Sequence, residues 1–263
     1  MKGYTAQVPR LIALTRAVSP AMADCELTHL SRVPINADRA AAQHREYERA
    51  LARLGAEVVP VPAAPAHADS VFVEDTAVVV REIAVIARPG AASRRGETSA
   101  VAEVLRVFRP LAFIEAPGTL DGGDVLRLGQ VLYVGLSGRT NLEGAAQLRG
   151  HLAPFGYEVR TVTPTGCLHL KTAVTAIGDD AVVLNAAWID PATFAHYQVV
   201  QVDPREPFAA NVVRVHDALL MAEAFPRTRE RLEARGARVA VVDASELAKA
   251  EGAVTCCSIL LEA

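Results

Sequence analysis

The sequence has no long hydrophobic run and no strong excess of either charge. None of its apolar stretches approaches the roughly 20 residues that cross a bilayer as a helix, and the apolar patch LIAL near the start is too short for the core of a signal peptide. The net charge is −3, with both signs mixed along the chain and no basic stripe of the kind that binds nucleic acid. We therefore expect neither a membrane nor a nucleic acid as a partner.

Cysteine is scarce, and the four cysteines are scattered. Cys25, Cys167, Cys256 and Cys257 form no C-x-x-C pair, so the sequence does not indicate a zinc ribbon. Few cysteines and no secretion signal favour a reducing, cytoplasmic setting. Low-complexity segments are also lacking, and 263 residues are enough for one large domain or two small ones.

What the sequence does contain is a repeated pattern of hairpins. Four times, two β-branched runs flank a short polar turn, with the turns at 81–82, 129–130, 178–180 and 216–217. A helix-like segment and then a short apolar strand follow each hairpin. A fifth copy opens the chain as a degenerate hairpin within 12–33, followed by a helix over 36–55 with an Asn36 or Asp38 cap and a Gly55 stop.

Five strand–strand–helix–strand units predict either a closed ring or an ordinary α/β sandwich with some hairpins. In a ring, the final strand within AVTCCSILL must return beside the first, which removes exposed edges. Closure would also place loops from all five units around one axis, where we expect a ligand cleft. We predict that residues 1–263 form a single domain.

Residues able to do chemistry fall at equivalent junctions of these units. Cys256 and Cys257 lie in an apolar run that reads as a strand, so one thiol would face the cleft and the other the opposite side. His169 lies just ahead of the third hairpin. In the plainer interpretation, both thiols are small core hydrophobes and the histidine is a satisfied core residue.

Acidic residues occupy similar junctions. Glu74 and Asp75 interrupt an apolar strand, so we expect one of them to point inward, where a carboxylate needs a cation or several donors. The alternative is a bulge at a solvated strand end. Asp121 and Asp124 flank two glycines ahead of the second hairpin, a pattern that is also typical of a simple turn.

Arginines follow the first two hairpins. Arg94, Arg95 and Arg139 are of the residue type that binds carboxylates in a bidentate manner, although each alone reads as a surface charge. Acids and arginines together imply a zwitterionic small molecule with an extra cation, such as arginine or a relative. A thiolate beside an imidazole would be an activated nucleophile for such a substrate.

Six segments resemble the dimethylarginine dimethylaminohydrolase family of the pentein superfamily: VFVEDTAVV, RPGAASRRGE, TLDGGDVL, VGLSGRTN, LHLKT and AVTCCSILL. They occur in family order from about residue 68 to the C-terminus. The resemblance implies an α/β fold, a five-bladed α/β propeller of pseudo-fivefold ββαβ units around a central active-site cleft. It implies hydrolysis of dimethylarginine and monomethylarginine to citrulline through a covalent thiouronium, without a cofactor or catalytic metal. An arginine deiminase, a citrulline hydrolase and a non-catalytic binding member remain alternatives.

The resemblance also implies a role for each matched residue. Cys256 is implied as the nucleophile, with Cys257 structural, His169 as the general acid/base, and Asp121 as the carboxylate that orients the histidine and the guanidinium. A homodimer is one assembly that the sequence allows. Adventitious zinc bound to the Cys/His/Asp cluster would inhibit the enzyme. The implied substrate contacts are Asp69, Glu74 and Asp75 for the cationic and amino groups, Arg94 and Arg139 for the carboxylate, Met22 at a lid position, and Ala250.

Overall fold

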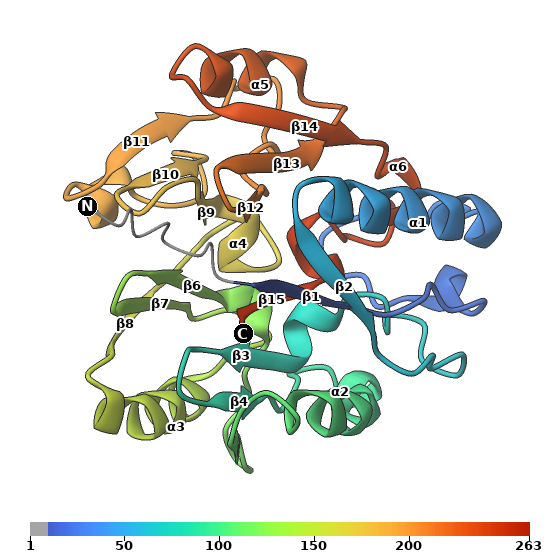
Figure 1. The fold of residues 1–263 in the computed structure, drawn as a ribbon, viewed down its shortest axis with the longest axis vertical. Coiled ribbons are helices and arrows are strands. Elements are labelled where there is room, and N and C mark those ends of the chain that lie inside the picture. Colours follow the sequence, from blue (N-terminus) through green and yellow to red (C-terminus); the bar gives the residue numbers. More distant parts are fainter. Residues whose placement is uncertain (1–9) are drawn as a thin grey trace, which may run out of the picture.

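The structure, a computed structural model, describes residues 10–263. Within them, the strands form five three-stranded sheets around a common centre (Figure 1). Each sheet combines an antiparallel pair with a third strand that runs parallel to the middle one. This arrangement confirms the predicted ring of five ββαβ units.

Four of the units follow one another along the chain, and their hairpin turns lie where the sequence predicts them. Their first two strands are β3 (Ala77–Val79) and β4 (Ala84–Ile86), β6 (Val125–Leu128) and β7 (Val131–Gly135), β9 (Val174–Ala176) and β10 (Ala181–Leu184), and β12 (Val213–Val215) and β13 (Ala218–Ala222). Their third strands are β5 (Leu111–Phe113), β8 (Glu158–Val162), β11 (Gln198–Gln201) and β14 (Arg238–Val242).

The fifth unit is assembled from both ends of the chain. β15 (Ile259–Glu262) pairs antiparallel with β1 (Leu11–Thr15), which pairs parallel with β2 (Ala56–Pro60). The predicted return of the final strand is therefore confirmed. The predicted degenerate hairpin within 12–33 is wrong, because residues 28–30 turn their backbone N–H groups toward the carboxylate of Glu251 and leave β15 to pair with β1.

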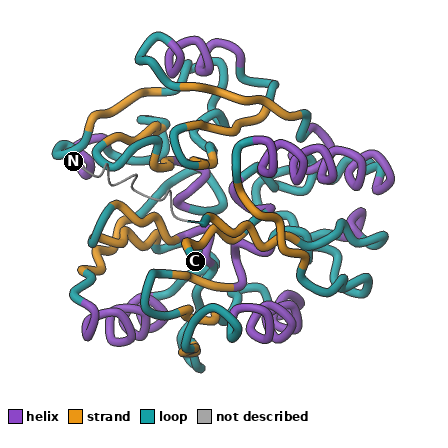
Figure 2. The backbone as a smooth tube through the Cα atoms, in the orientation of Figure 1, coloured by secondary structure: helices purple, strands orange, loops and turns teal. Residues whose placement is uncertain are grey.

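The longer helices lie toward the outside of the ring (Figure 2). The Asn36 side chain caps the first of them and accepts from the Arg39 N–H at 2.9 Å, while Gly55 follows its end with φ +100°. The helices are α1 (Ala37–Arg53), α2 (Thr98–Leu105), α3 (Leu142–Leu152), α5 (Pro226–Glu233), and the short α4 (Leu170–Ala173) and α6 (Ser245–Ala248). Single 3-10 segments are η1 (Met22–Asp24), η2 (Val73–Thr76), η3 (Ala92–Glu97), η4 (Gly122–Asp124), η5 (Ala153–Phe155), η6 (Pro191–Phe194) and η7 (Thr255–Cys257).

Apolar side chains hold the helices to the sheets. Leu148 and Leu152 of α3, for example, are fully buried and share one cluster with Val134 of β7. Complete burial of such a side chain contributes about 1.5–3 kcal/mol. Among the described residues, no helix combines the length and the apolar character needed to traverse a bilayer. The packed units thus form a rigid frame. This frame holds the segments that precede the first strand of each unit.

Candidate active site

Short turns carry the polar side chains to one end of the ring axis. η2 precedes β3, η4 precedes β6, α4 precedes β9 and η7 precedes β15. η2 contacts η4 and η7, and α4 contacts η4, so segments far apart in the sequence meet here. The strands predicted through 73–76 and 255–257 are therefore wrong: both segments form 3-10 turns. These turns let Glu74 and Asp75 both be buried beside partners, where a regular strand would turn one of them outward.

Cys256 and Cys257 lie in η7, and their thiols diverge. Successive side chains of a 3-10 helix point about 120° apart, so the two thiols reach different surroundings even though the segment is not a strand. Cys256 is half-buried and lines a cavity. Cys257 is fully buried, and its thiol donates to the carbonyl oxygen of Ala253 at 3.5 Å.

His169 lies between two buried carboxylates. Its Nε2 is 3.1 Å from Asp121 Oδ2, and its Nδ1 is 3.7 Å from Asp75 Oδ1. Burial disfavours the charged ring, but the carboxylates around it, which include Asp124, outweigh burial and raise the pKa of His169 to about 9. The imidazole is therefore protonated at neutral pH and can act as a proton donor.

The two glycines of LDGGD allow this close approach. A Cβ on Gly123 would lie 2.7 Å from both His169 Nδ1 and Asp75 Oδ1, and one on Gly122 would lie 2.0 Å from the carbonyl oxygen of Glu74. The Gly123 N–H also donates to Asp75 Oδ1 at 3.0 Å. The segment is thus more than a simple turn, because any side chain at these two positions would push the histidine and the acids apart.

Arg94 stands behind Asp75 with all three nitrogens in use. Its Nη1 lies 2.5 Å from Asp75 Oδ2, its Nε donates to Glu97, and its Nη2 donates to Glu97 and to the carbonyl oxygen of Phe72. Burial raises the pKa of Asp75, but His169 and Arg94 more than compensate and lower it overall. Arg94 therefore braces an ionised Asp75. Its contact with a substrate carboxylate stays a prediction.

One small cavity brings most of the predicted residues together. Its empty volume is about 310 Å³. The predicted residues that line it are Asp69, Asp75, Arg94, Arg139, His169, Ala250 and Cys256, and its other lining residues are Glu26, Phe72, Leu168, Glu251 and Gly252.

Asp121 and Glu74 do not line this cavity. Asp121 is fully buried and accepts the Gly90 N–H on Oδ1 at 2.9 Å, which leaves Oδ2 for His169. It is thus placed to orient the imidazole. The Glu74 carboxylate lies 2.7 Å from Lys171 Nζ, and its contact with substrate stays a prediction.

Met22 does not line the cavity, and its lid position stays a prediction. Its side chain is fully buried in a core cluster with Cys25 and Tyr47, because an unbranched apolar side chain fills the gap there. The following loop covers the cavity through polar contacts. The Glu26 N–H donates to Asp69 Oδ2 at 3.1 Å, and Glu251 accepts from the backbone of residues 28–30. Sequence reasoning missed both glutamates, since a carboxylate that binds backbone N–H groups leaves no motif.

The Cys256 thiol is protonated in the protein alone. Burial and the negative charges of Glu74 and Asp75 raise the pKa of Cys256 to about 12. The expected thiolate beside an imidazole is therefore not the state of the free protein, in which a neutral thiol and an imidazolium line the same cavity. A cation beside the sulfur would counter the two acids and favour the thiolate.

Three of these residues also offer a metal-binding geometry. Ligand atoms of Asp75, Asp121 and His169 all lie within 4.8 Å of one another, the one such group among residues 10–263. Cys256 is outside this group. The cluster expected to bind adventitious zinc is therefore two carboxylates and an imidazole, and each of the three already contacts another protein group.

Comparisons with known proteins agree with this geometry. The family described as "N,N dimethylarginine dimethylhydrolase, eukaryotic" matches residues 28–261. The chain is 42% identical to an N(G),N(G)-dimethylarginine dimethylaminohydrolase of Streptomyces coelicolor over 97% of this chain and 98% of that one. It is 36% identical to the protein of that name from Pseudomonas aeruginosa, over 84% and 88% of the two chains.

Solved structures give the same result. A cysteine-to-serine mutant of the Pseudomonas aeruginosa enzyme, complexed with citrulline, superposes with a TM-score of 0.92 at 33% identity, covering 97% of this chain and 100% of that one. The N-terminal domain of a cyanobacterial arginine dihydrolase has a TM-score of 0.83 at 20% identity and shares the fold. The chain belongs to the dimethylarginine dimethylaminohydrolase family of hydrolases.

Proposed function

We propose that the protein hydrolyses Nω,Nω-dimethyl-L-arginine and Nω-methyl-L-arginine to L-citrulline and dimethylamine or methylamine. The observation that supports this most directly is the convergence of Cys256, His169, Asp75 and Arg139 on one cavity. These residues supply a nucleophile, a proton donor, an acid for a guanidinium and a cation for a carboxylate. Relatives that carry the dimethylarginine name are 42% and 36% identical, against 20% for the arginine dihydrolase, which favours methylated arginines over arginine.

The charges along the cavity suit both ends of such a substrate. We assign the guanidinium to the carboxylates of Asp75 and Asp69, since planar N–H groups match carboxylate oxygens. Arg139, whose Nη2 donates to Thr28 Oγ1 at 3.1 Å, is assigned to the substrate carboxylate. The two ends would then hold the central guanidinium carbon near the Cys256 sulfur.

Substrate itself would activate the nucleophile. A guanidinium is a poor electrophile because resonance spreads its charge, so a neutral thiol would not attack it. The bound cation opposes the charges of Glu74 and Asp75 that raise the pKa of Cys256, and so it stabilises the thiolate, whose proton passes to solvent because His169 is already protonated. Activation on binding would keep the free protein's thiol unreactive toward other electrophiles.

The reaction then proceeds in two halves. The Cys256 sulfur bonds to the central carbon, and the C–N bond to dimethylamine breaks as His169 donates its proton to the departing nitrogen. The thiouronium adduct remains on the sulfur. Neutral His169 next takes one proton from water, and the oxygen adds to the same carbon. The C–S bond then breaks as the remaining hydroxyl proton passes to the sulfur, which releases citrulline and restores the neutral thiol and the protonated imidazole. Asp121 holds the ring in one orientation throughout.

Assembly and location belong to the same proposal. We predict a homodimer, which sedimentation velocity of the full chain would test, and a cytoplasmic location, which fractionation of the source cells would test. We also keep the prediction that the chain is one domain. Residues 1–9 of that prediction lie outside the described residues.

One assay separates the proposal from its rivals within the superfamily. The protein is incubated with dimethylarginine, monomethylarginine, arginine, agmatine or citrulline, and citrulline, ammonia and free amines are measured. We expect citrulline and amine from the two methylated substrates, and a mass adduct on the Cys256 peptide after an acid quench. Turnover of arginine without turnover of its methylated forms would assign the protein to the arginine deiminase reaction instead.

A further inference from the structure

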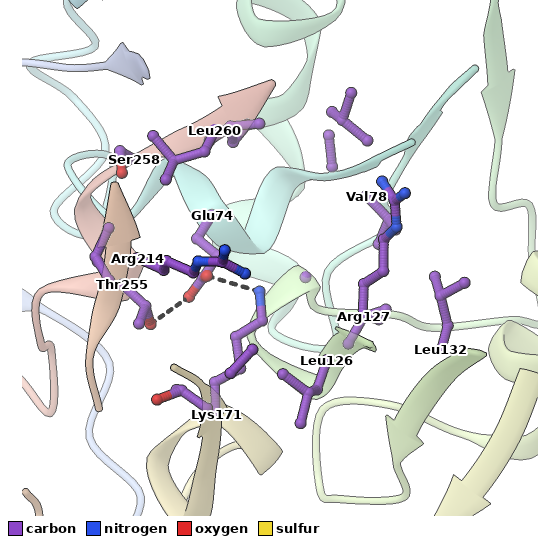
Figure 3. Close-up of a pocket in the computed structure, with 18 of the residues that line it drawn as sticks. Glu74, Val78, Leu126, Arg127, Leu132, Lys171, Arg214, Thr255, Ser258 and Leu260 are labelled. Atoms are coloured by element: carbon purple, nitrogen blue, oxygen red, sulfur yellow. Dashed lines mark hydrogen bonds and ion pairs between the residues drawn. The ribbon is translucent and has the colours of Figure 1, made fainter. Parts of the chain in front are cut away.

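A second and larger cavity, the axial cavity, is enclosed by the first strands of the five sheets, and Figure 3 shows the residues that line it. Its space, counted with the solvent at its open mouth, is about 970 Å³. It is lined by the first strand of each of the five sheets, β3, β6, β9, β12 and β15, and by Leu132 of β7. The two cavities share no lining residue. The hydrolysis proposed above uses none of this space.

The walls of this axial cavity are aliphatic, and its charged groups are mainly cationic. Three cations face a single acid in the lining, Arg127, Lys171 and Arg214 against Glu74. A concave apolar site with a few convergent polar groups is the usual form of a small-molecule site. The aliphatic wall residues include Val78, Val79, Leu126, Leu132, Val213 and Leu260.

The acid in this cavity is already neutralised. Glu74 Oε1 lies 2.7 Å from Lys171 Nζ, and Glu74 Oε2 accepts from Thr255 Oγ1 at 2.7 Å. This buried set forms the layer between the two cavities, because Glu74 and Thr255 each precede a residue that lines the active-site cavity. A ligand in the axial cavity would therefore leave the site of Cys256 free.

Two arginines remain at the mouth with donors to spare. The Nε of Arg127 donates to the carbonyl oxygen of Gly129, and its guanidinium carbon lies 5.3 Å from the centroid of the Tyr157 ring, but among residues 10–263 its two Nη atoms have no protein acceptor. Arg214 donates from Nε to the carbonyl oxygen of His216 at 3.1 Å and pairs through Nη1 with Asp179 at 2.6 Å, which leaves its Nη2 free among residues 10–263. The Asp179 side chain is 94% exposed, so water weakens that pair. Arginine N–H groups without buried acceptors favour a carboxylate, and the aliphatic walls favour an apolar body attached to it.

We propose that the axial cavity binds a small monocarboxylate with an apolar body, its carboxylate between Arg127 and Arg214 and its body against the strand walls. The site is distinct from the catalytic one in position and in chemistry. It rejects cations at its mouth, whereas the catalytic cavity accepts a cation beside its acids. Binding needs no turnover, so the proposal stands or falls independently of the proposed function.

Titration calorimetry of the full-length protein with four probes tests the ligand class. Hexanoate has the charge and the body, acetate lacks the body, hexylamine reverses the charge and 1-hexanol has none. We expect saturable binding of hexanoate and at least about tenfold weaker binding of acetate, since each buried methylene contributes about 0.8 kcal/mol. Hexylamine should not bind. Equal binding of hexanoate and hexylamine, or no binding of hexanoate, overturns the proposal.

Variants locate the binding. Arg127→Gln with Arg214→Gln should weaken hexanoate by at least about tenfold, while Arg106→Gln, at an exposed arginine on the outer face, serves as the matched control. Ala176→Leu narrows the cavity with both arginines intact and should also abolish binding. Arg139→Gln should leave it unchanged. Binding that survives Ala176→Leu, or that is lost in Arg139→Gln, would place hexanoate elsewhere and refute the site. Thermal unfolding confirms that each variant is folded.

Discussion

The two ends of the ring axis differ in charge: buried acids on the turns before the first strands dominate one end, and arginines on the strands dominate the other. At the catalytic end, buried acids such as Asp75 and Asp121 surround His169, and each acid has a cation or N–H donors close by. At the other end, Arg127 and Arg214 lie near solvent and their partners are weak or few. Charges buried in a protein change free energies far more than exposed ones. The comparison therefore predicts large effects at one end and small effects at the other.

The connections explain why the ends differ. At the catalytic end, single helical turns precede four of the five first strands and bring polar groups inward. At the other end, short hairpin turns such as 129–130 join the first strands to the second ones. Short turns have no room for inward side chains, so the strands themselves line the cavity there.

The largest effect is expected at the nucleophile. Cys256→Ser should lower kcat for dimethylarginine at least about a thousandfold, because serine cannot form the thiolate that attacks the guanidinium carbon. Cys257→Ser is the matched control one residue away. It alters a core residue outside the cavity, and we expect an active protein with lower stability. Full activity of Cys256→Ser would contradict the assignment of Cys256 as the nucleophile. Loss of activity in Cys257→Ser at unchanged stability would contradict the structural role of Cys257.

The second largest effect is expected in the layer of Glu74, Lys171 and Thr255 between the two cavities. Lys171→Met removes the cation beside Glu74 and leaves a buried carboxylate without its partner, so we expect a loss of about 3 kcal/mol in the free energy of unfolding. Adding Glu74→Gln should restore much of that loss, since no buried charge then remains. Urea unfolding at pH 7 measures both. A double variant as unstable as the single one would show that the loss comes from packing.

Stability should also depend on pH through His169. The pKa of His169 is raised from 6.5 to about 9, so its contribution is complete below pH 6.5 and disappears as the pH rises through 9. That interval corresponds to at most about 3–4 kcal/mol, at about 1.4 kcal/mol per pH unit. The free energy of unfolding should therefore be larger at pH 6 than at pH 9.5. This difference should be smaller in His169→Gln. An equal pH dependence in both proteins would assign it to other groups.

The sequence predicts the ring better than it predicts the site. Alternating β-branched runs and short turns depend on local preferences, so the hairpins and the return of the last strand were readable. The turns at 73–76 and 255–257 were not, because the apolar runs beside them favour strands and only tertiary partners hold these residues in 3-10 form. Family resemblance, and no pattern in the residues, distinguished Cys256 from its neighbour. The direction of Glu74 and the burial of Met22 depend on side-chain packing that leaves no periodicity.

Asp124 is a residue to which the sequence assigned no role. Its Oδ1 accepts the Leu170 N–H at 2.9 Å, directly after His169, and its Oδ2 accepts from Ser137 Oγ at 2.6 Å. Ser137 Oγ in turn accepts the Arg139 N–H at 2.9 Å. Asp124 is therefore a positioning residue that connects the proton donor with the arginine assigned to the substrate carboxylate.

Asp124→Asn should have a moderate effect on catalysis. It keeps the shape but removes a negative charge near the imidazolium, so the pKa of His169 falls and the basic limb of the kcat–pH profile moves to lower pH. We expect about a tenfold lower kcat above pH 8 with KM little changed. Asp124→Ala should raise KM as well, because it also removes the contact to Ser137. A purely structural role would lower kcat at every pH without moving the limb.

The smallest effect is expected at the far end, where Arg214 and Asp179 form the exposed counterpart of the Lys171–Glu74 pair. Their side chains are 38% and 94% exposed, against 20% and 10% for Lys171 and Glu74, although the pairing distances are 2.6 and 2.7 Å. A double-mutant cycle with Arg214→Gln and Asp179→Asn should therefore give a coupling energy below about 0.5 kcal/mol. Raising the salt to 1 M should abolish it, because screening acts on exposed charges. A coupling as large as that of the buried pair would mean that burial does not set the difference between the two ends.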